Sequence, residues 1–240
     1  MKKSIFILLM FTMTSLAATK FESDIYSTNA GDLKITFIGH GTLYFEWNGK
    51  VVHVDPWSRL ADYSQLPKAD IILVTHEHGD HLSPDAIKSV SEEKTTVILT
   101  EKCTSKVSGI VMKNGDVQEI DGITIKAVPA YNIQNKRDNG QPFHPKGDGN
   151  GYVITCGDKT IYVAGDTENI PEMAELKGKV DIAFLPMNLP YTMSPEMAAD
   201  AARKISPKIL YPYHFGDTDV SRLVVLLENE KIDVRIRKLQ

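Results

Sequence analysis

Alternation of apolar and polar residues predicts strands in the first part of the chain. Residues 33–39 and 43–47 both alternate with the two-residue period of a strand that buries one face. Asn48-Gly49 then supplies a tight hairpin turn into a third strand at 51–54. The later strands are expected at 71–75, 97–100, 117–120, 123–128, 151–156, 160–164, 180–185, 208–211 and 234–236, with further hairpin turns at Asp121-Gly122 and Gly157-Asp158.

Serine-proline pairs mark the starts of two expected helices. Ser83 is placed as an N-cap, with Pro84 as the first residue of a helix over 84–90. Ser194-Pro195 begins a second helix that runs to about residue 205, and a third is expected at about 220–229. Hairpins early in the chain and helices between the later strands predict two sheets with helices outside them. The expected fold class is therefore α/β, as a layered sandwich.

The first residues are typical of a bacterial export signal. Lys2 and Lys3 precede an apolar stretch at 5–16, and Ser15-Leu16-Ala17 fits a cleavage site between small residues. The apolar stretch is about 12 residues long, shorter than the roughly 20 that a spanning helix needs, which favours cleavage over an uncleaved membrane anchor. We therefore expect a signal peptide at 1–18, one domain at 19–240, no stable membrane insertion after cleavage, and a periplasmic or secreted protein.

Composition narrows the possible partners. The 240 residues are 42% hydrophobic and 24% charged, which is ordinary for a globular domain, and the formal net charge is -4. No run of lysine and arginine appears, so nucleic-acid binding lacks its electrostatic basis. The two cysteines, Cys103 and Cys156, are far apart in a chain with enough apolar residues for a core, so we expect them to remain unpaired. The sequence carries no signal of an oligomeric state.

One short segment holds most of the candidate chemistry. His76-Glu77-His78-Gly79-Asp80-His81 follows the apolar run at 71–75 and precedes the helix start at Ser83. The segment therefore lies on a loop at the carboxyl end of a strand, where rigid elements can direct several side chains toward one point. Imidazole and carboxylate groups are ligands that suit zinc and similar first-row metals.

Three more ligand-type residues follow later strands or lie between them. Asp166 ends a strand in the sequence Ala-Gly-Asp-Thr, and His214 follows another in Pro-Tyr-His-Phe-Gly. His144 lies in a long loop rich in glycine, proline and asparagine. Seven side chains of this kind suffice for two metals with an open position, the arrangement that hydrolytic two-metal sites use. The seven are His76, His78, Asp80, His81, His144, Asp166 and His214.

These segments resemble the metallo-β-lactamase superfamily. Residues 75–81, 164–167 and 213–214 look like its motifs. Residues 37–42 and 54–57 look like those of its small stand-alone metal-dependent hydrolases, the branch that includes ascorbate-6-phosphate lactonase. The likeness extends from about residue 33 to the end. It implies a four-layer αββα sandwich with the site along one edge.

The resemblance also implies roles for individual residues. His76, His78 and His144 would hold one metal, while Asp80, His81 and His214 would hold the second and Asp166 would bridge them. Asp55 would orient the histidine loop. Asn132 stands where the family pattern leads one to expect a histidine, and His144 comes later in the chain. We expect His144 rather than Asn132 to complete the first site, because imidazole is the better zinc ligand. The implied cofactors are two divalent ions, zinc first, with manganese or iron as alternatives.

Other polar residues have both functional and structural interpretations. His40, between two glycines, can serve as a proton donor or substrate contact, or can be a structural histidine. His53, between two valines in a strand, is expected to be structural, and Glu77 to orient its loop or face solvent. Four residues in loops after strand ends can line a pocket or pack against neighbours: Trp57, Tyr131, Asn188 and Tyr191.

Taken together, these features predict a secreted dinuclear metal-dependent hydrolase that acts on a small molecule. Metal-bound hydroxide would attack a lactone, amide or ester carbonyl, or a phosphodiester, with Asp80 or His40 handling the proton. Two alternatives remain open from the sequence. The first is a metal-dependent redox enzyme on the same fold, and the second is a noncatalytic protein that binds metals or ligands.

Overall fold

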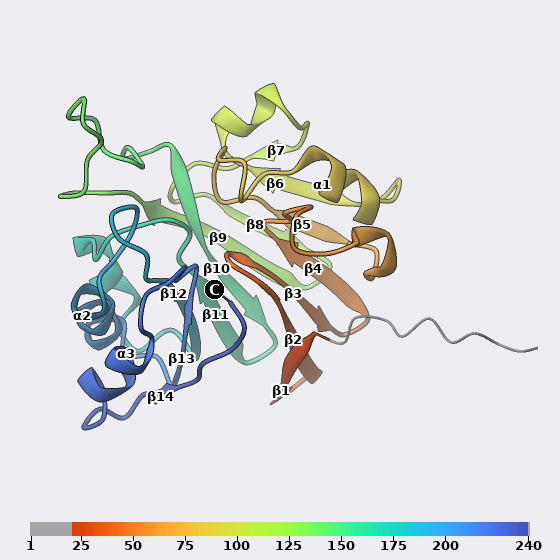
Figure 1. Cartoon of the computed structure of the whole chain (residues 1–240). Helices are drawn as coiled ribbons and strands as arrows, with labels where there is room; N and C mark the ends of the chain where they lie inside the picture. Colours follow the sequence, from red (N-terminus) through yellow and green to blue (C-terminus); the bar gives the residue numbers. More distant parts are fainter. Residues whose placement is uncertain (1–20, 240) are drawn as a thin grey trace, which may run out of the picture.

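The computed structural model describes residues 21–239, in which two seven-stranded sheets pack face to face (Figure 1). The signal peptide predicted at 1–18 lies outside the described residues. Strands follow chain order across each sheet. The first sheet contains β1 (Glu22–Thr28), β2 (Gly31–Gly39), β3 (Thr42–Trp47), β4 (Lys50–Val54), β5 (Ile71–Leu73), β6 (Thr96–Leu99) and β7 (Ile110–Val111). The second contains β8 (Val117–Ile120), β9 (Ile123–Ala130), β10 (Gly149–Cys156), β11 (Lys159–Val163), β12 (Ile182–Pro186), β13 (Ile209–Tyr213) and β14 (Asp233–Val234).

Both sheets change from antiparallel to parallel pairing halfway across. Pairing from β1 to β4 is antiparallel and pairing from β4 to β7 is parallel. The second sheet repeats this arrangement, antiparallel from β8 to β11 and parallel from β11 to β14. Ligand sites in α/β proteins form beyond the carboxyl ends of parallel strands, and here both sheets offer such ends.

Helices cover the outer faces of the two sheets (Figure 1). On the first sheet, α1 (Pro84–Val90) buries Ala86 and Ile87 in a cluster with Ile72 of β5. On the second, α2 (Pro195–Ile205) contacts β12, and α3 (Ser221–Leu226) contacts α2. Ser83 and Ser194 cap α1 and α2 as predicted, each accepting a hydrogen bond from a backbone N–H of the first turn. The expected αββα sandwich is confirmed.

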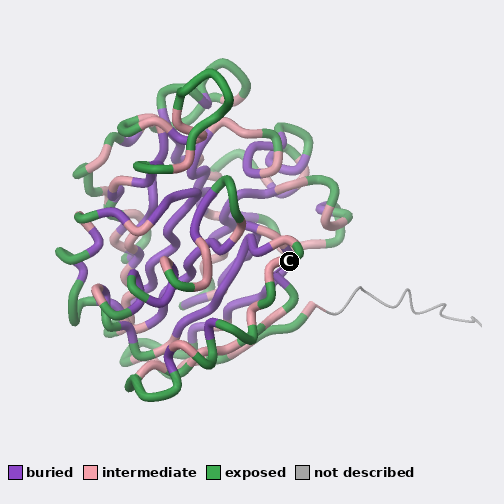
Figure 2. The backbone as a smooth tube through the Cα atoms, turned by 60° about the vertical axis from the view of Figure 1, so that its left-hand side comes forward, coloured by how far each residue is buried: buried purple, intermediate pink, exposed green. Residues whose placement is uncertain are grey.

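The main core lies between the sheets, where Figure 2 shows much of the backbone as buried. Aromatic rings from opposite sheets meet there: the ring centroids of Phe37 in β2 and Tyr211 in β13 are 5.0 Å apart. Cys156 packs in this core and Cys103 in the smaller cluster under α1, so both cysteines are buried and unpaired, as expected. Within residues 21–239, no helix has the length and apolar character needed to cross a bilayer.

Expected hairpins are present, but β1 was not foreseen. The turn residues Asn48 and Asp121 adopt φ angles of 50° and 53°, each followed by a glycine with positive φ, as tight hairpins require. β1 pairs with β2 along its full length, yet its Ile25 is 63% exposed. It is an edge strand fixed by polar contacts such as those between Asp24 and Arg237, so it lacks the buried apolar face that makes a strand visible in sequence. The two-residue β7 is too short for such a signal.

Candidate metal centre

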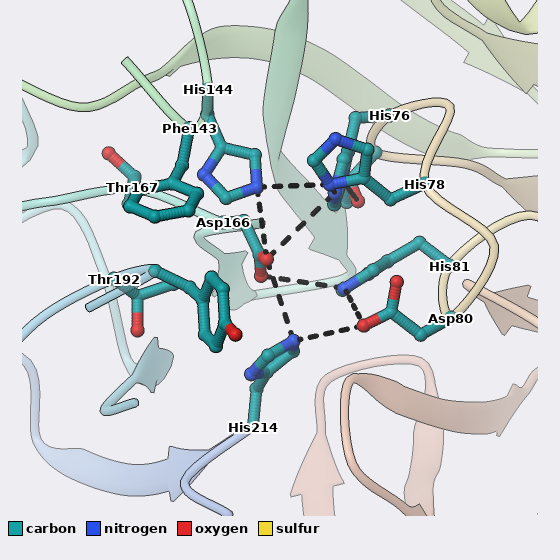
Figure 3. A network of polar contacts seen from close by, with 12 residues as sticks. His76, His78, Asp80, His81, Phe143, His144, Asp166, Thr167, Thr192 and His214 are labelled. Carbon is teal, nitrogen blue, oxygen red and sulfur yellow. Dashed lines mark hydrogen bonds and ion pairs between the residues drawn. The ribbon is translucent and has the colours of Figure 1, made fainter. Parts of the chain in front are cut away.

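The seven predicted ligands meet at one edge of the sandwich, beyond the ends of strands from both sheets. The loop after β5 carries His76 to His81, β11 leads to Asp166, and β13 leads to His214. His144 joins them from the long loop between β9 and β10. Figure 3 shows the seven side chains pointing toward a common centre. The structure therefore brings together residues that are up to about 140 positions apart in sequence.

Three histidines form the first ligand group. His76 Nε2 lies 3.1 Å from His78 Nδ1, and His144 Nε2 lies 3.2 Å from the same nitrogen. Such a convergence of ring nitrogens on one point is the arrangement that three imidazole ligands of one ion adopt. The group {His76, His78, His144} thus matches the predicted first site, with each ligand atom within 4.8 Å of the others.

The second group surrounds Asp80. Its Oδ2 lies 3.8 Å from His81 Nε2 and 3.6 Å from His214 Nε2. His40 Nε2 lies 3.0 Å from the same oxygen, so His40 belongs to this group by position. The ring of His40 also packs against that of His214, with centroids 3.7 Å apart. His40 therefore faces the site rather than the protein core.

Asp166 lies between the two groups. Its Oδ1 is 3.5 Å from His81 Nε2 in the second group. Its Oδ2 is 3.3 Å from His144 Nε2 in the first group and 3.5 Å from His214 Nε2 in the second. The carboxylate is 4% exposed. One buried aspartate that contacts ligands of both groups has the placement of a bridging ligand.

Asp55 fixes the histidine loop from behind. Its Oδ2 accepts a hydrogen bond of 2.8 Å from His81 Nδ1, which leaves His81 Nε2 facing Asp166. The same carboxylate accepts bonds of 2.7 Å from the backbone N and from Oγ1 of Thr75, the residue that begins the loop. Carboxylates that hold the second nitrogen of a ligand histidine set its orientation and basicity. The orienting contact expected of Asp55 is present.

Asn132 plays the same part for His144. Asn132 Oδ1 accepts a hydrogen bond of 2.7 Å from the backbone N of His144 and one of 2.8 Å from its Nδ1. His144 Nε2 then faces the cluster. Asn132 therefore orients His144, a candidate ligand, from the position where the family pattern leads one to expect a histidine.

Glu168 holds the segment that carries Asn132, and sequence reasoning missed it. Its carboxylate accepts hydrogen bonds of 2.6–3.1 Å from the backbone N–H groups of Ile133, Gln134 and Asn135. It also accepts one of 3.2 Å from the side chain of Asn132. Glu168 is 1% exposed, which is rare for a glutamate unless it is bonded in this way. In the sequence, nothing distinguishes it from a solvated loop residue.

The two site carboxylates favour their charged form. Burial alone would raise the pKa of Asp166, but the electrostatic interaction with His214 and His81 holds that pKa well below its usual value. Burial likewise opposes ionisation of Asp80, and contacts with His214 and His40 lower its pKa below the usual range. Two permanent negative charges therefore face the centre, which favours a bound cation.

Burial and carboxylate charge together shift the pKa values of two cluster histidines in opposite directions. Burial lowers the pKa of His76 well below its ordinary value, so its imidazole is neutral, the form that binds metal. Burial also lowers the pKa of His81, but Asp166 and Asp55 more than offset this and raise it to about 9. A proton and a metal ion compete for the same lone pair of His81 Nε2, so surroundings that favour the proton also favour a metal cation.

The donor set fits bound metal. Among the described residues, His81 Nε2, Asp166 Oδ1 and His214 Nε2 are buried polar atoms without a hydrogen-bond partner. Buried polar atoms normally have partners, and all three point into the centre. Imidazole nitrogens and carboxylate oxygens at these positions would complete the coordination of zinc or a similar ion.

A cavity of about 510 Å³ opens over the metal centre. Its lining includes Asn188 and Tyr191, two of the loop residues whose role the sequence left open. A second hollow of about 460 Å³ lies against β9, β10, β11 and the 3₁₀ helix η3 (Pro171–Leu176), and none of the seven ligands lines it. The first cavity is lined by His40, His78, Gly79, Asp80, Arg137, Phe143, His144, Asp166, Asn188, Tyr191 and His214.

The remaining polar and aromatic candidates from the sequence contact protein groups outside the set of seven proposed ligands. His53 is fully buried, stacks on Tyr44 and has its Nε2 3.0 Å from the carbonyl oxygen of Pro67, so its structural interpretation is confirmed. Glu77 lies near Lys102 at the surface, with N and O atoms 3.7 Å apart. Tyr131 is buried, and its hydroxyl contacts Glu172. Trp57 packs against His40, with ring centroids 5.0 Å apart.

Comparison with known proteins establishes the family. Residues 34–214 match the model of the beta-lactamase superfamily domain. A UPF0173 metal-dependent hydrolase of Pelotomaculum thermopropionicum is 34% identical over 196 residues, which cover 77% of this chain and 85% of the relative. The chain belongs to the metallo-β-lactamase superfamily, in its branch of small stand-alone metal-dependent hydrolases.

Solved structures share the architecture. A protein of Parabacteroides distasonis, assigned as a metal-dependent hydrolase, has a TM-score of 0.88 and 50% identity, covering 92% of this chain and 100% of that chain. A metallo hydrolase of Ignicoccus hospitalis has a TM-score of 0.72, covering 86% of this chain and 95% of that chain. At 24% identity, the second likeness concerns the fold alone.

Proposed function

We propose that this protein is a dinuclear metal-dependent hydrolase that cleaves a small molecule at a carbonyl or phosphoryl centre. The observation that carries the proposal is the position of Asp166. Its buried carboxylate contacts both the His76–His78–His144 group and the Asp80–His81–His214 group. All of this lies beneath a cavity large enough for a small substrate.

The proposed ligands divide into two groups, one for each ion. His76, His78 and His144 would hold the first ion, Asp80, His81 and His214 the second, and Asp166 would be shared. When bound, a pair of divalent ions supplies Lewis acidity that lowers the pKa of water and stabilises negative charge on the attacked centre. Zinc suits this set of five imidazoles and two carboxylates, and manganese or iron are the alternatives.

The chain's own side chains supply orientation and proton transfer. Asp55 and Asn132 fix the ring planes of His81 and His144, so these ligands need not reorganise during the reaction. His40 lines the cavity and contacts Asp80 through Nε2. We propose that His40 donates a proton to the leaving group or holds the substrate, with Asp80 as its charged partner.

Substrate turnover tests this function. Metal-replete protein should hydrolyse at least one member of a panel of lactones, esters, amides and phosphodiesters, and chelator should abolish that turnover. His53→Gln changes a buried histidine of β4 that contacts Pro67 instead of the site, so this variant should keep the turnover. Absence of turnover across the panel would favour the metal- or ligand-binding alternative. Native iron with oxygen-dependent chemistry would favour the redox alternative.

We also propose that the protein is exported, with the periplasm or the exterior as its destination. The support is the basic and apolar pattern at residues 2–17. Fractionation of the native host, with mass spectrometry of the amino terminus, should find the protein outside the cytoplasm and beginning near residue 19. An intact terminus on a cytoplasmic protein would contradict the proposal.

A further inference from the structure

Arg137 lines the cavity over the metal centre. It is the only lysine or arginine among the described residues that form this lining. The other lining side chains are the metal-centre residues and the polar or aromatic residues Phe143, Asn188 and Tyr191. A substrate that enters the cavity therefore meets one permanent cationic side chain besides the metal centre.

Local contacts hold the guanidinium in place. Arg137 Nη2 donates a hydrogen bond of 3.3 Å to the carbonyl oxygen of Phe143, and Arg137 Cζ lies 5.0 Å from the centre of the Phe143 ring. The Phe143 ring in turn meets Tyr191 edge-on, with centroids 5.1 Å apart. The backbone N of Arg137 donates to the carbonyl oxygen of Gln141 at 2.8 Å, which closes a small hairpin in the loop. Arg137 is thus attached to an aromatic wall that is itself packed.

No carboxylate neutralises Arg137. Within residues 21–239, Arg203, Arg222, Arg235 and Arg237 all pair with aspartate or glutamate, whereas Arg137 forms no ion pair. A guanidinium has five N–H donors, and only one of them has a protein acceptor here. The remaining donors stay available for an acceptor with the planar, two-oxygen geometry of a carboxylate or phosphate.

We propose that Arg137 binds an anionic group of the substrate, a carboxylate or a phosphate monoester that is separate from the bond being cleaved. This inference rests on the proposed hydrolytic function and names its substrate class: small anionic esters, lactones or amides. The metal centre engages the reacting group and Arg137 engages the charged end, so the two together orient the molecule in the cavity. Binding of this kind depends on charge, because a neutral analogue cannot accept the charge-assisted hydrogen bonds that a carboxylate or phosphate accepts from the guanidinium.

Two pairs of probes separate charge from reactivity. The first pair is a five-membered lactone with a side-chain carboxylate and its methyl ester. The second is a lactone with a phosphorylated hydroxymethyl group and the unphosphorylated compound. Wild-type protein should favour at least one anionic partner by tenfold or more in kcat/KM, the discrimination expected from one charge-assisted interaction. The pair that shows the preference identifies carboxylate or phosphate as the ligand.

Arg137→Gln should erase that preference. KM for the anionic probe should rise at least tenfold with kcat little changed, while the neutral partner reacts as with wild type. Arg137→Lys should restore the preference in part, because it keeps the charge but loses the two-pronged geometry. Arg59→Gln is the matched control, since Arg59 is also exposed, lies over a tryptophan ring, forms no ion pair among the described residues and does not line the cavity.

Two results would overturn the inference: no anionic preference in the wild type, or an equal effect of Arg137→Gln on charged and neutral probes. If none of the four probes turns over, their dissociation constants for the metal-loaded protein replace the kinetics. A charge preference in binding that disappears in Arg137→Gln then supports the anion site while contradicting hydrolysis. Equal binding of charged and neutral probes by wild type would contradict the anion site.

Discussion

Asn132 Oδ1 accepts hydrogen bonds from both the backbone N and the ring Nδ1 of His144, at 2.7 and 2.8 Å. The double contact fixes the position of the residue and its tautomer at once. With the proton on Nδ1, the lone pair of Nε2 faces His78 and Asp166. His144, a proposed ligand from a long loop, is thereby held with Nε2 toward the other proposed ligands.

This relationship predicts that Asn132→Ala weakens metal binding at the first group. Loss of a residue that orients a ligand typically lowers metal affinity by about 10–100-fold. Competition with a chromophoric chelator should show this loss for one of two equivalents. Asn132→Asp should recover the affinity only in part, because it keeps the acceptor oxygen but replaces the amide that donates to Glu168 with a second carboxylate. Unchanged affinity in Asn132→Ala would show that His144 needs no such partner.

Glu168 is predicted to stabilise the loop that carries Asn132. Glu168→Ala leaves three backbone N–H groups and the Asn132 amide without an acceptor, which should lower the free energy of unfolding by about 2–4 kcal/mol. Urea denaturation of metal-free protein measures the change. The exposed Glu93 provides the control, and Glu93→Ala should alter stability by less than about 0.5 kcal/mol. Equal stability of the two variants would contradict the assigned role.

Asp166→Ala should abolish turnover and weaken both metal equivalents, because its carboxylate contacts ligands of both groups. His53→Gln should retain turnover and both metals, since an amide N–H can still donate to the Pro67 carbonyl. Elemental analysis after dialysis, together with activity on any responsive substrate, distinguishes the two. Asp166→Ala protein that keeps one tightly bound metal and normal activity would refute the shared-ligand assignment.

His53 also predicts a pH dependence of stability. Burial lowers its pKa from the ordinary 6.5 to about 4, so the folded protein holds it neutral. Between these values the unfolded chain binds the proton more readily, and stability therefore falls as pH decreases. From pH 7.5 to 5.0 the free energy of unfolding of wild type should fall by about 2 kcal/mol more than that of His53→Gln. Parallel losses in urea titrations at the two pH values would contradict this.

Much of the candidate metal centre could be predicted because most of its residues lie in short motifs or directly after apolar strands. His76, His78, Asp80 and His81 share one six-residue segment, and Asp166 and His214 directly follow apolar strands. Period-two alternation located β2 and β3, apolar runs and hairpin turns located most of the other strands, and Ser83 and Ser194 located two helix starts. These signals all depend on residues close together in sequence, where propensity and pattern act.

The supporting contacts could not be predicted because they join distant segments. Glu168 bonds to backbone groups more than 30 positions earlier, and Asn132 acts through a histidine 12 positions later. β1 is held by contacts of Asp24 with Tyr211 and Arg237, and its own sequence carries little apolar pattern. The proposed role of Arg137 depends on its place in the cavity lining, which forms only when distant segments come together. These roles arise from contacts between residues far apart in the sequence, so no local sequence pattern indicates them.

Anomalous X-ray scattering from crystals of metal-loaded protein tests the central claim most directly. We predict two peaks about 3.5–4 Å apart, the spacing of two-metal hydrolytic sites. One should lie among His76, His78 and His144, with His144 Nε2 at about 2.0–2.1 Å if the metal is zinc, and the other among Asp80, His81 and His214. Asp166 should contact both. A single peak under excess metal, or a His144 ring that points to solvent beside two bound ions, would contradict the account.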